Sequence, residues 1–332
     1  MTERDHFFDN FKVLLIFMTV FAHYLRMNGS FHEGSFAGFV YITAFSFIMQ
    51  GWLFVSGYFS HNLDKCRRSA FRSFLLPYMI FMPVMSLIRL MLFGHAALNY
   101  LVPSVALWYL LAMFVYRFAI KDLARIRTSV LLPLTAALFF AAGEIPFLGR
   151  ELALGRLFSF LVFFVAGFVF RPEYIRKIRE MHWAVGAAVL TLLLTYSFLF
   201  SYIRPFPVTI LHMRQSYSAF GLDPLQGVLA RLVTGAAALL WIFVLIRFIP
   251  EKKYFFTGIG SRTITVYILH IPLRYVLQRY SILGGGPFSS FLIFFLSAAV
   301  VFVFSRPAVK KSYDYVLNYI YKLMLKCVTM FR

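Results

Sequence analysis

Long apolar stretches recur along nearly the whole chain of 332 residues and constrain its fold more than any other feature. About 20 apolar residues in a helix cross the roughly 30 Å hydrocarbon core of a bilayer. Ten stretches approach this length, and the one between Arg127 and Glu144 is the shortest. The sequence therefore predicts an all-α, polytopic integral membrane protein with about ten transmembrane helices, at residues 11–27, 38–59, 71–93, 101–120, 129–142, 152–170, 183–203, 224–249, 263–280 and 288–304.

The composition excludes the usual soluble classes. The chain is 61% hydrophobic and only 14% charged, whereas soluble domains average about 45–50% apolar and about 25% charged residues. A cytosolic enzyme, a disordered chain and a disulfide scaffold all fit this composition poorly. The two cysteines, Cys66 and Cys327, match no metal-ligand spacing, so we expect no metal site.

The net charge of +20 is explained by topology. Such a charge can indicate nucleic-acid binding, but the basic residues here fall in short clusters between apolar stretches, so no nucleic-acid partner is expected. Basic and nearly uncharged connections alternate, which is the positive-inside pattern. It puts 24 of the 33 Lys and Arg residues, and both termini, in the cytoplasm. The basic connections are 60–72, 117–128, 171–180, 247–262 and the tail from 305.

The two terminal segments have separate interpretations. The first apolar stretch lacks a small-residue cleavage site and contains His23, so we expect a retained helix instead of a signal peptide. The tail from 305 to 332 is basic, and its apolar residues, such as Val309, Tyr313 and Leu317, follow a roughly helical period. This pattern predicts an amphipathic helix on the inner leaflet.

Ionisable residues inside predicted spans are the first candidates for function. Lys12 and His23 are 11 residues apart, which places them on one stripe of a helix about 16 Å apart along its axis. This arrangement suits an anionic ligand that enters from the cytoplasm toward a general base. Alternatively, His23 bonds a neighbouring helix and Lys12 extends to the headgroups.

Several motifs resemble the membrane acyltransferase-3 family, especially its fucose 4-O-acetylase-like branch. In that family an Arg or Lys precedes a His with ten residues between them, as Lys12 precedes His23 here. Further matches follow in the expected order and cover the chain from residue 4 to about 273. The motifs are RDHFFDNFKVLLIFMTVFAH (4–23), FVSGY (54–58), RSFLLPY (72–78), ALWYLLAMF (106–114) and SRTITVYILHIPL (261–273).

The resemblance implies transfer of an acetyl or other acyl group from cytoplasmic acyl-CoA to a saccharide hydroxyl. The donor would be acetyl-CoA, and the acceptor a cell-surface or lipid-linked saccharide on the outer side of the inner (plasma) membrane. His23 would be the essential histidine, and Lys12 would replace the frequent Arg of the motif. Residues 1–304 would form the transmembrane acyltransferase domain and residues 305–332 a basic cytoplasmic tail.

The same resemblance implies donor contacts. Arg68 and Arg72 fit the CoA phosphates by charge, although the chain has Lys65-x-x-Arg68 and Arg68-x-x-x-Arg72 where some members have Arg-x-x-Arg. Ser56 either leaves room for pantetheine or allows close helix packing. Trp108 is either a wall of the site or an interfacial anchor. His270 either orients the acyl thioester or bridges helices.

A further group of arginines lies in the outer half or at the outer ends of predicted spans, where the positive-inside rule disfavours cations. We expect some of them to line an outer vestibule for a polar or anionic acceptor, and others to extend to outer headgroups. They are Arg26, Arg89, Arg231, Arg274 and Arg279.

One other functional class is compatible with many spans and buried arginines, namely a transporter or flippase for a lipid-linked saccharide. It predicts repeat symmetry and helices broken at corresponding places in two halves. Pro77 and Pro83 in the third predicted span have no clear counterpart, and no internal repeat is evident. The sequence therefore favours the acyltransferase, and it does not encode the oligomeric state.

Overall fold

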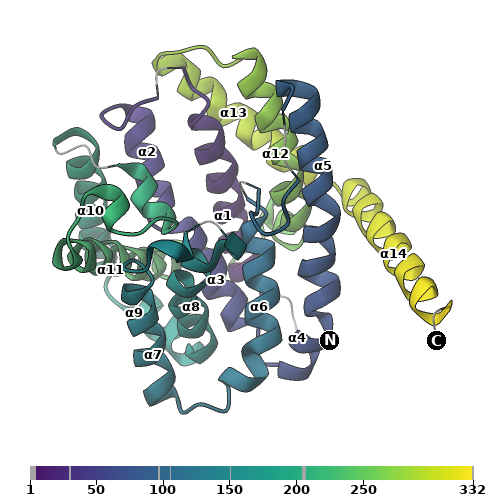
Figure 1. The fold of residues 1–332 in the computed structure, drawn as a ribbon. Coiled ribbons are helices and arrows are strands. Elements are labelled where there is room, and N and C mark those ends of the chain that lie inside the picture. The colour runs from purple at the N-terminus through teal and green to yellow at the C-terminus, as the bar shows by residue number, and fades with distance from the viewer. Residues whose placement is uncertain are drawn as a thin grey trace.

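The computed structural model describes residues 5–29, 31–95, 98–104, 106–149, 151–203 and 207–330. Every regular element within these ranges is a helix (Figure 1), so the predicted all-α fold is confirmed. A helix lies within each predicted span, and the long ones are α1 (His6–Leu25), α2 (Phe36–Phe45), α3 (Ile48–Tyr58), α5 (Leu76–Phe93), α6 (Trp108–Leu123), α7 (Thr128–Ala141), α8 (Leu154–Val169), α10 (Trp183–Phe198), α11 (Pro224–Phe248), α12 (Thr263–Tyr280) and α13 (Pro287–Phe304).

Shorter elements connect these helices, and one long helix follows them. They are α4 (Leu63–Ala70), η1 (Phe71–Leu75), η2 (Pro146–Leu148), η3 (Glu151–Ala153), α9 (Pro172–Glu180), η4 (Leu199–Ile203), η5 (Val208–His212), η6 (Ser218–Phe220), η7 (Thr257–Ser261) and α14 (Pro307–Met330).

The chain is a multi-pass membrane protein. In the described part of the chain, six helical stretches are long and apolar enough to cross a membrane, or seven if the bent pair α13 and α14 is one span. The helix α7 is apolar but has only 14 residues, and α12 contains several polar side chains, including His270 and Arg274. The count of ten spans and the cytoplasmic termini stay predictions.

The second predicted span consists of two helices. Between α2 and α3 the chain leaves helical geometry at Phe47, whose φ is −141°. The Ser46 hydroxyl donates to the Ile42 carbonyl at 2.7 Å, a local bond of the kind that bends helices. The break lies close to Tyr41 and Phe45, two side chains that line the main cavity.

The crossing of α3 and α8 is unusually close. A Cβ atom on Gly57 would collide with the Phe164 carbonyl oxygen, and one on Gly167 would collide with the Phe54 carbonyl oxygen. Each helix therefore presents a glycine to the backbone of the other, as in small-residue contacts between membrane helices. The glycine of the Ser-Gly motif therefore lies at a close helix crossing, and the donor role considered for Ser56 stays a prediction.

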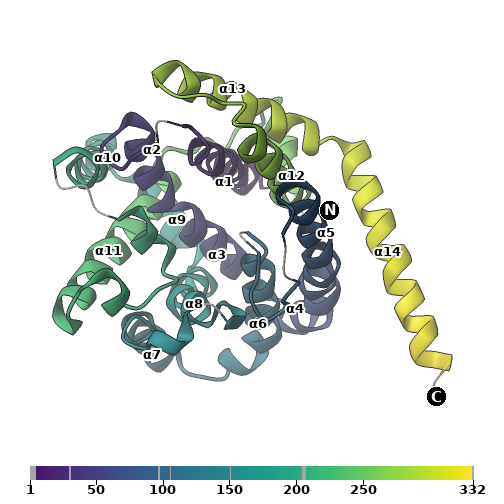
Figure 2. The same ribbon diagram turned by 45° about the horizontal axis from the view of Figure 1, so that its top comes forward.

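The position of α12 relative to α1 is set by contacts between the start of α1 and the segment that precedes α12. The Asn10 side-chain amide donates to the carbonyls of Pro250 and Lys252 at 2.8 and 2.9 Å. Its oxygen accepts from the Thr257 hydroxyl at 2.6 Å, and Gly260 packs directly on the backbone of Asp9. These contacts fasten η7 to α1, so that the following α12 runs along α1 (Figure 2).

The connections predicted to lie outside are held against the bundle by tyrosine hydroxyls. Tyr217 donates to the Phe140 carbonyl at 2.8 Å, and Tyr78 donates to the Tyr100 carbonyl at 2.5 Å. Tyr275 and Ser104 share a hydrogen bond of 2.9 Å. As a result, the segments 98–104 and 207–223 lie over the helix ends and supply side chains to the site.

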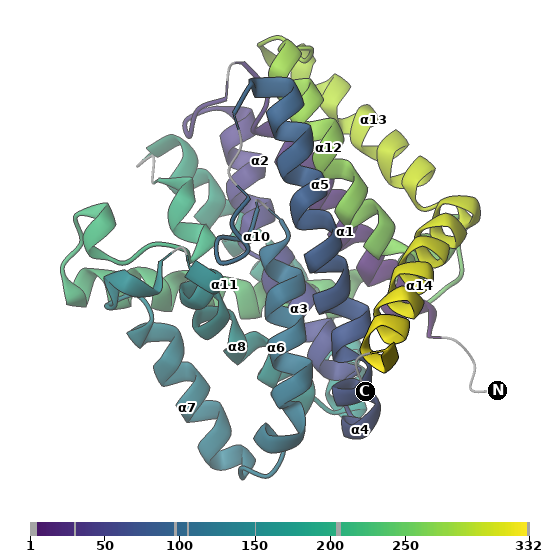
Figure 3. The same cartoon turned by 45° about the vertical axis from the view of Figure 1, so that its right-hand side comes forward.

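The tail forms the helix that the sequence predicts. At the junction of α13 and α14 the chain bends by 59°, and α14 projects from the bundle (Figure 1). It contacts α5 and α12, which lie side by side (Figure 3). Exposed Tyr315, Tyr319 and Leu323 line α14, which is compatible with the predicted position on a leaflet.

Candidate active site

The centre of the site is a pair of histidines from α1 and α12. His23 Nδ1 lies 2.8 Å from His270 Nε2, and His270 Nδ1 lies 3.0 Å from the Val266 carbonyl oxygen. A carbonyl only accepts, so His270 Nδ1 carries the hydrogen, and Nε2 of a neutral His270 accepts from His23 Nδ1–H. This pattern assigns the tautomer of His23 and leaves its Nε2 with a free lone pair.

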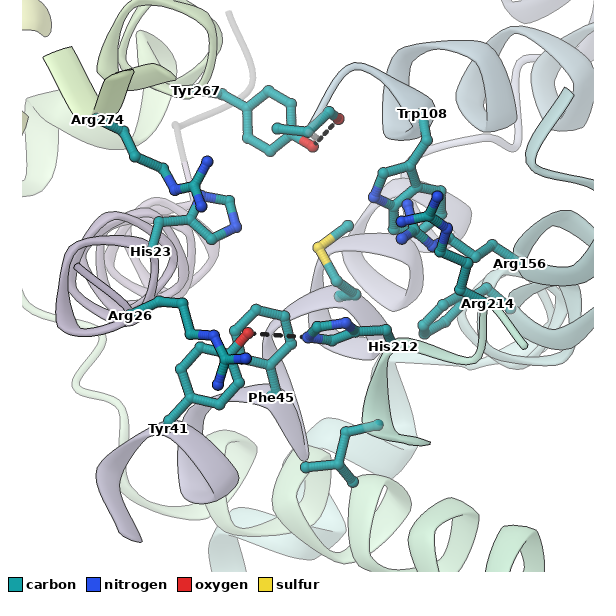
Figure 4. Close-up of a pocket in the computed structure, with 14 residues that line it drawn as sticks. His23, Arg26, Tyr41, Phe45, Trp108, Arg156, His212, Arg214, Tyr267 and Arg274 are labelled. Atoms are coloured by element: carbon teal, nitrogen blue, oxygen red, sulfur yellow. Dashed lines mark hydrogen bonds between the residues drawn. The ribbon is translucent and has the colours of Figure 1, made fainter. Parts of the chain in front are cut away.

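His23 faces a cavity of about 190 Å³. In Figure 4 its ring points into the cavity and Arg274 lies beside it. The walls come from α1, α2, α3, α6, α8, η5 and α12, together with the short segment after η5. Apolar side chains of Phe45, Met49 and Phe160 complete the lining. An imidazole with an unprotonated nitrogen in such a cavity is suited to general-base catalysis.

Four arginines line the same cavity, one each from the end of α1 at its C-cap, α8, the segment after η5, and α12. They are Arg26, Arg156, Arg214 and Arg274 (Figure 4). No Asp or Glu is among the described residues that line this cavity. The cavity is therefore strongly electropositive.

A second hydrogen-bonded pair lies across the cavity from His23. The Tyr41 hydroxyl is 2.8 Å from His212 Nε2 (Figure 4). Burial, together with the smaller effect of the nearby charges of Arg156 and Arg26, lowers the pKa of His212 to about 3. His212 is therefore neutral at physiological pH, which makes it a hydrogen-bonding wall and not a further cation.

A larger cavity of about 720 Å³ adjoins the first. Trp108, Arg156 and Arg214 line both cavities. Arg89 and His95 line the larger one, together with residues of the predicted outer connections. The two cavities therefore lie next to each other, with the larger one toward the predicted outer side.

A third, inner cavity of about 150 Å³ lies on the opposite side of Tyr267. Tyr267 lines both this cavity and the one with His23, and its hydroxyl donates to the Ala106 carbonyl at 2.5 Å. Trp52 and Tyr109 form the other aromatic walls, and Phe74 and Thr263 lie next to predicted cytoplasmic connections. Tyr267 thus separates an inner space from the outer ones.

Four of the predicted site residues besides His23 line these cavities, and a fifth, His270, lies behind His23. Arg26, Arg274 and Trp108 line the His23 cavity, and Arg89 lines the larger one. His270 is fully buried behind His23. Trp108 also lies under the Arg156 guanidinium, with 4.8 Å from Cζ to the ring centroid.

Other predicted residues lie elsewhere. Lys12 forms an ion pair with Asp9 at 2.8 Å near the start of α1 and does not line the cavity. Arg231 is buried between α7, α8 and α11, where it donates to the Phe139 carbonyl and, at 2.8 Å, to the Ser159 hydroxyl. These bonds connect three helices, so the position of Arg231 fits a structural role.

The three remaining donor candidates lie toward the opposite end of the bundle. Ser56 is 3.1 Å from the Tyr109 hydroxyl. Arg68 is exposed. Arg72 donates to the Asn318 side chain of α14, and its guanidinium lies 5.4 Å from the Tyr321 ring centroid.

Among the described residues, no group of three or more His, Cys, Asp or Glu side chains that could hold a metal ion is found.

Comparison with known families identifies the class of the protein. The family model Acyl_transf_3, described as an acyltransferase domain, matches residues 5–306. The chain belongs to this acyltransferase family. The match contains every described residue of the three cavities and ends before α14. Comparisons with curated proteins and with solved structures found no match. The fucose 4-O-acetylase-like branch stays a prediction.

Several residues of the acyltransferase site were not singled out from the sequence. Arg156 carried a signal, because it is a cation inside a predicted span. Tyr267 lies in the motif at 261–273, whereas Tyr41 and His212 carried no signal, since a tyrosine or histidine near a membrane interface is common. Their roles follow only from the packing of α2, η5 and α12 around one cavity.

Proposed function

We propose that this acyltransferase moves an acetyl or other acyl group from cytoplasmic acyl-CoA to a hydroxyl of a cell-surface or lipid-linked saccharide. The observation that supports this proposal best is the tautomer of His23. Its Nε2 faces the cavity with a free lone pair, while Nδ1–H is held by His270.

The reaction starts from a neutral His23. Nε2 takes the proton of the acceptor hydroxyl as the hydroxyl oxygen attacks the thioester carbonyl. The tetrahedral oxyanion then collapses, the carbon–sulfur bond breaks, and the thiolate of CoA receives the proton from His23. The Arg274 guanidinium beside His23 is positioned to stabilise the oxyanion.

A second route uses the same residue as a nucleophile. Nε2 attacks the thioester, CoA leaves, and the acceptor hydroxyl then attacks the acyl-histidine. Both routes need His23, and they differ in whether the protein carries the acyl group when no acceptor is present.

The two substrates approach from opposite sides in this proposal. The inner cavity beyond Tyr267 adjoins predicted cytoplasmic connections and suits the slender acyl-pantetheine arm. Exposed Arg68 is available for the CoA phosphates, whereas Arg72 is engaged by α14. The acceptor enters through the two outer cavities.

The test is transfer of radiolabelled acetyl from acetyl-CoA to saccharide, in inside-out vesicles containing the full-length protein. His23→Ala is expected to reduce labelling by roughly 10²- to 10⁴-fold, the usual contribution of a general base. His61→Gln is the matched control, because His61 is exposed and lines none of the three cavities. Near-normal labelling by His23→Ala would refute both routes.

A further inference from the structure

Four guanidinium groups line the His23 cavity. Arg26, Arg156, Arg214 and Arg274 come from four separate segments of the chain, and no acidic side chain is among the described residues lining the cavity. Ionisable groups at membrane depth are costly and usually pair with an opposite charge. Repulsion between four cations around about 190 Å³ adds to that cost.

The contacts of Arg26 and Arg156 leave hydrogen-bond donors unused. Arg26 lies over Phe31, with 4.6 Å from Cζ to the ring centroid, and Arg156 lies over Trp108 at 4.8 Å. Stacking occupies the face of a guanidinium and leaves its edge N–H groups available. Arg156 Nε is buried and has no hydrogen-bond partner among the described residues. By contrast, Arg231, outside the cavity, donates to two protein oxygens.

We infer that the acceptor carries a carboxylate or phosphate close to the hydroxyl that is acylated, and that Arg26 and Arg156 hold this anion. The inference rests on the proposed function and names its substrate class, an anionic saccharide. An unpartnered buried donor next to further guanidiniums is the arrangement that planar, bidentate recognition of such anions requires.

The phosphates of the donor do not explain this cluster. In CoA the pantetheine arm separates the thioester from the phosphates. The arginines line the same small cavity as His23. When the thioester reaches His23, the CoA phosphates are therefore still separated from this cavity by the whole length of the pantetheine arm. The anion among the arginines therefore belongs to the other substrate.

The size of the cavities limits where the charge lies on the acceptor. About 190 Å³ corresponds to roughly six waters of about 30 Å³ each, which is comparable to one sugar ring. The anionic group is then on the reacting sugar or on the atom that links it to its neighbour. The adjoining cavity, with Arg89 and His95, accommodates the rest of the saccharide.

The experiment uses membranes that contain the natural acceptor and either the full-length protein or its His23→Ala variant. Radiolabelled acetyl-CoA is added, and the label that depends on His23 is fractionated on an anion exchanger. The inference expects the labelled saccharide to be retained. A labelled but neutral saccharide overturns it while leaving the proposed function intact, and absence of His23-dependent label overturns the proposed function itself.

Mild acid distinguishes the two sources of charge. It cleaves a glycosyl phosphate and leaves a uronic acid carboxylate, so loss of retention after this treatment identifies a lipid-linked phosphate. Continued retention identifies an acidic sugar. Both outcomes support the inference, and the treatment preserves the acetyl ester for detection.

Substitutions of Arg156 test whether this side chain binds the anionic group of the acceptor. Arg156→Gln is expected to lower kcat/KM for the acceptor roughly tenfold or more, as for the loss of one charge-assisted hydrogen bond, with the KM for acetyl-CoA unchanged. Arg156→Lys should recover part of the loss. Arg279→Gln is the matched control, because exposed Arg279 at the end of α12 lines neither outer cavity. Equal acceptor kinetics for Arg156→Gln, Arg279→Gln and wild type would overturn the assignment.

Discussion

At the scale of single residues, the chemistry of His23 depends on a neighbour 247 positions away in the chain. His270 donates to its own helix at Val266 and accepts from His23, so it fixes which nitrogen of His23 is basic. His270 does not line the His23 cavity. It is therefore best described as a positioning residue, and the thioester contact proposed for it from the sequence is not needed.

Substitution of His270 tests this positioning role. His270→Ala should lower kcat roughly 10- to 100-fold, the usual cost of losing a residue that orients another, and should shift the acid limb of the kcat–pH profile. His270→Gln keeps an acceptor for His23 Nδ1–H and should restore part of both. If His270 only connected helices, thermal stability would fall and the pH profile of the folded variant would be that of wild type.

Arg68 is the residue on which the donor assignment depends most. It is exposed on α4, whereas Arg72 is already bound by α14. Arg68→Gln should raise the KM for acetyl-CoA roughly two- to fivefold, because an exposed ion pair contributes about 0.5–1 kcal/mol. Lys65→Gln, also exposed on α4, is the control for net charge. A KM that rises equally in both variants would indicate a general effect of the basic face.

The sequence predicted His23 because an ionisable residue inside an apolar stretch is visible in one helix. It did not predict the contact with His270, since that contact depends on Asn10 fastening the segment before α12 to α1. Arg231 shows the same limit. The sequence predicted that Arg231 lies in the outer half of a span. It did not predict the two oxygen atoms to which Arg231 donates, because these belong to α7 and α8.

At the scale of elements, the positions of the helices were predictable, because apolar length and the alternation of basic connections are local properties of the chain. The break between α2 and α3 was not, since it depends on a side-chain bond from Ser46 to Ile42. For the Ser-Gly motif, the sequence allowed two interpretations, and close helix packing was only one of them. Gly57 and Gly167 now account for the close crossing of α3 and α8.

Alanine at either glycine should destabilise the bundle. In each case the new Cβ meets backbone of the opposite helix, which cannot move aside as a side-chain tip can. We expect Gly57→Ala and Gly167→Ala to cost at least the 1–3 kcal/mol typical of overpacking, seen as a lower Tm in detergent. Gly34→Ala is the control, because its nearest contact would be at 3.6 Å. Unchanged Tm values for both helix variants would contradict the close packing.

At the scale of the whole molecule, the three cavities form a series across the bundle. The inner one adjoins predicted cytoplasmic connections, the outer two adjoin predicted outer connections, and Tyr267 lies between them. An acyltransferase with substrates on opposite sides of a membrane must let the acyl group pass while excluding water from the thioester. The ring of Tyr267, held by its bond to the Ala106 carbonyl, is placed to do this.

Removing this ring should uncouple donor consumption from transfer. Tyr267→Ala joins the inner cavity to the His23 cavity, so water reaches a bound thioester. Free CoA should then appear without acceptor, measured by thiol release, while transfer per CoA released falls. Tyr267→Phe keeps the ring and loses only the hydroxyl bond to Ala106, so its coupling should stay close to wild type. Full coupling in Tyr267→Ala would show that another side chain, such as Trp108 or Tyr109, separates the donor from the outer water.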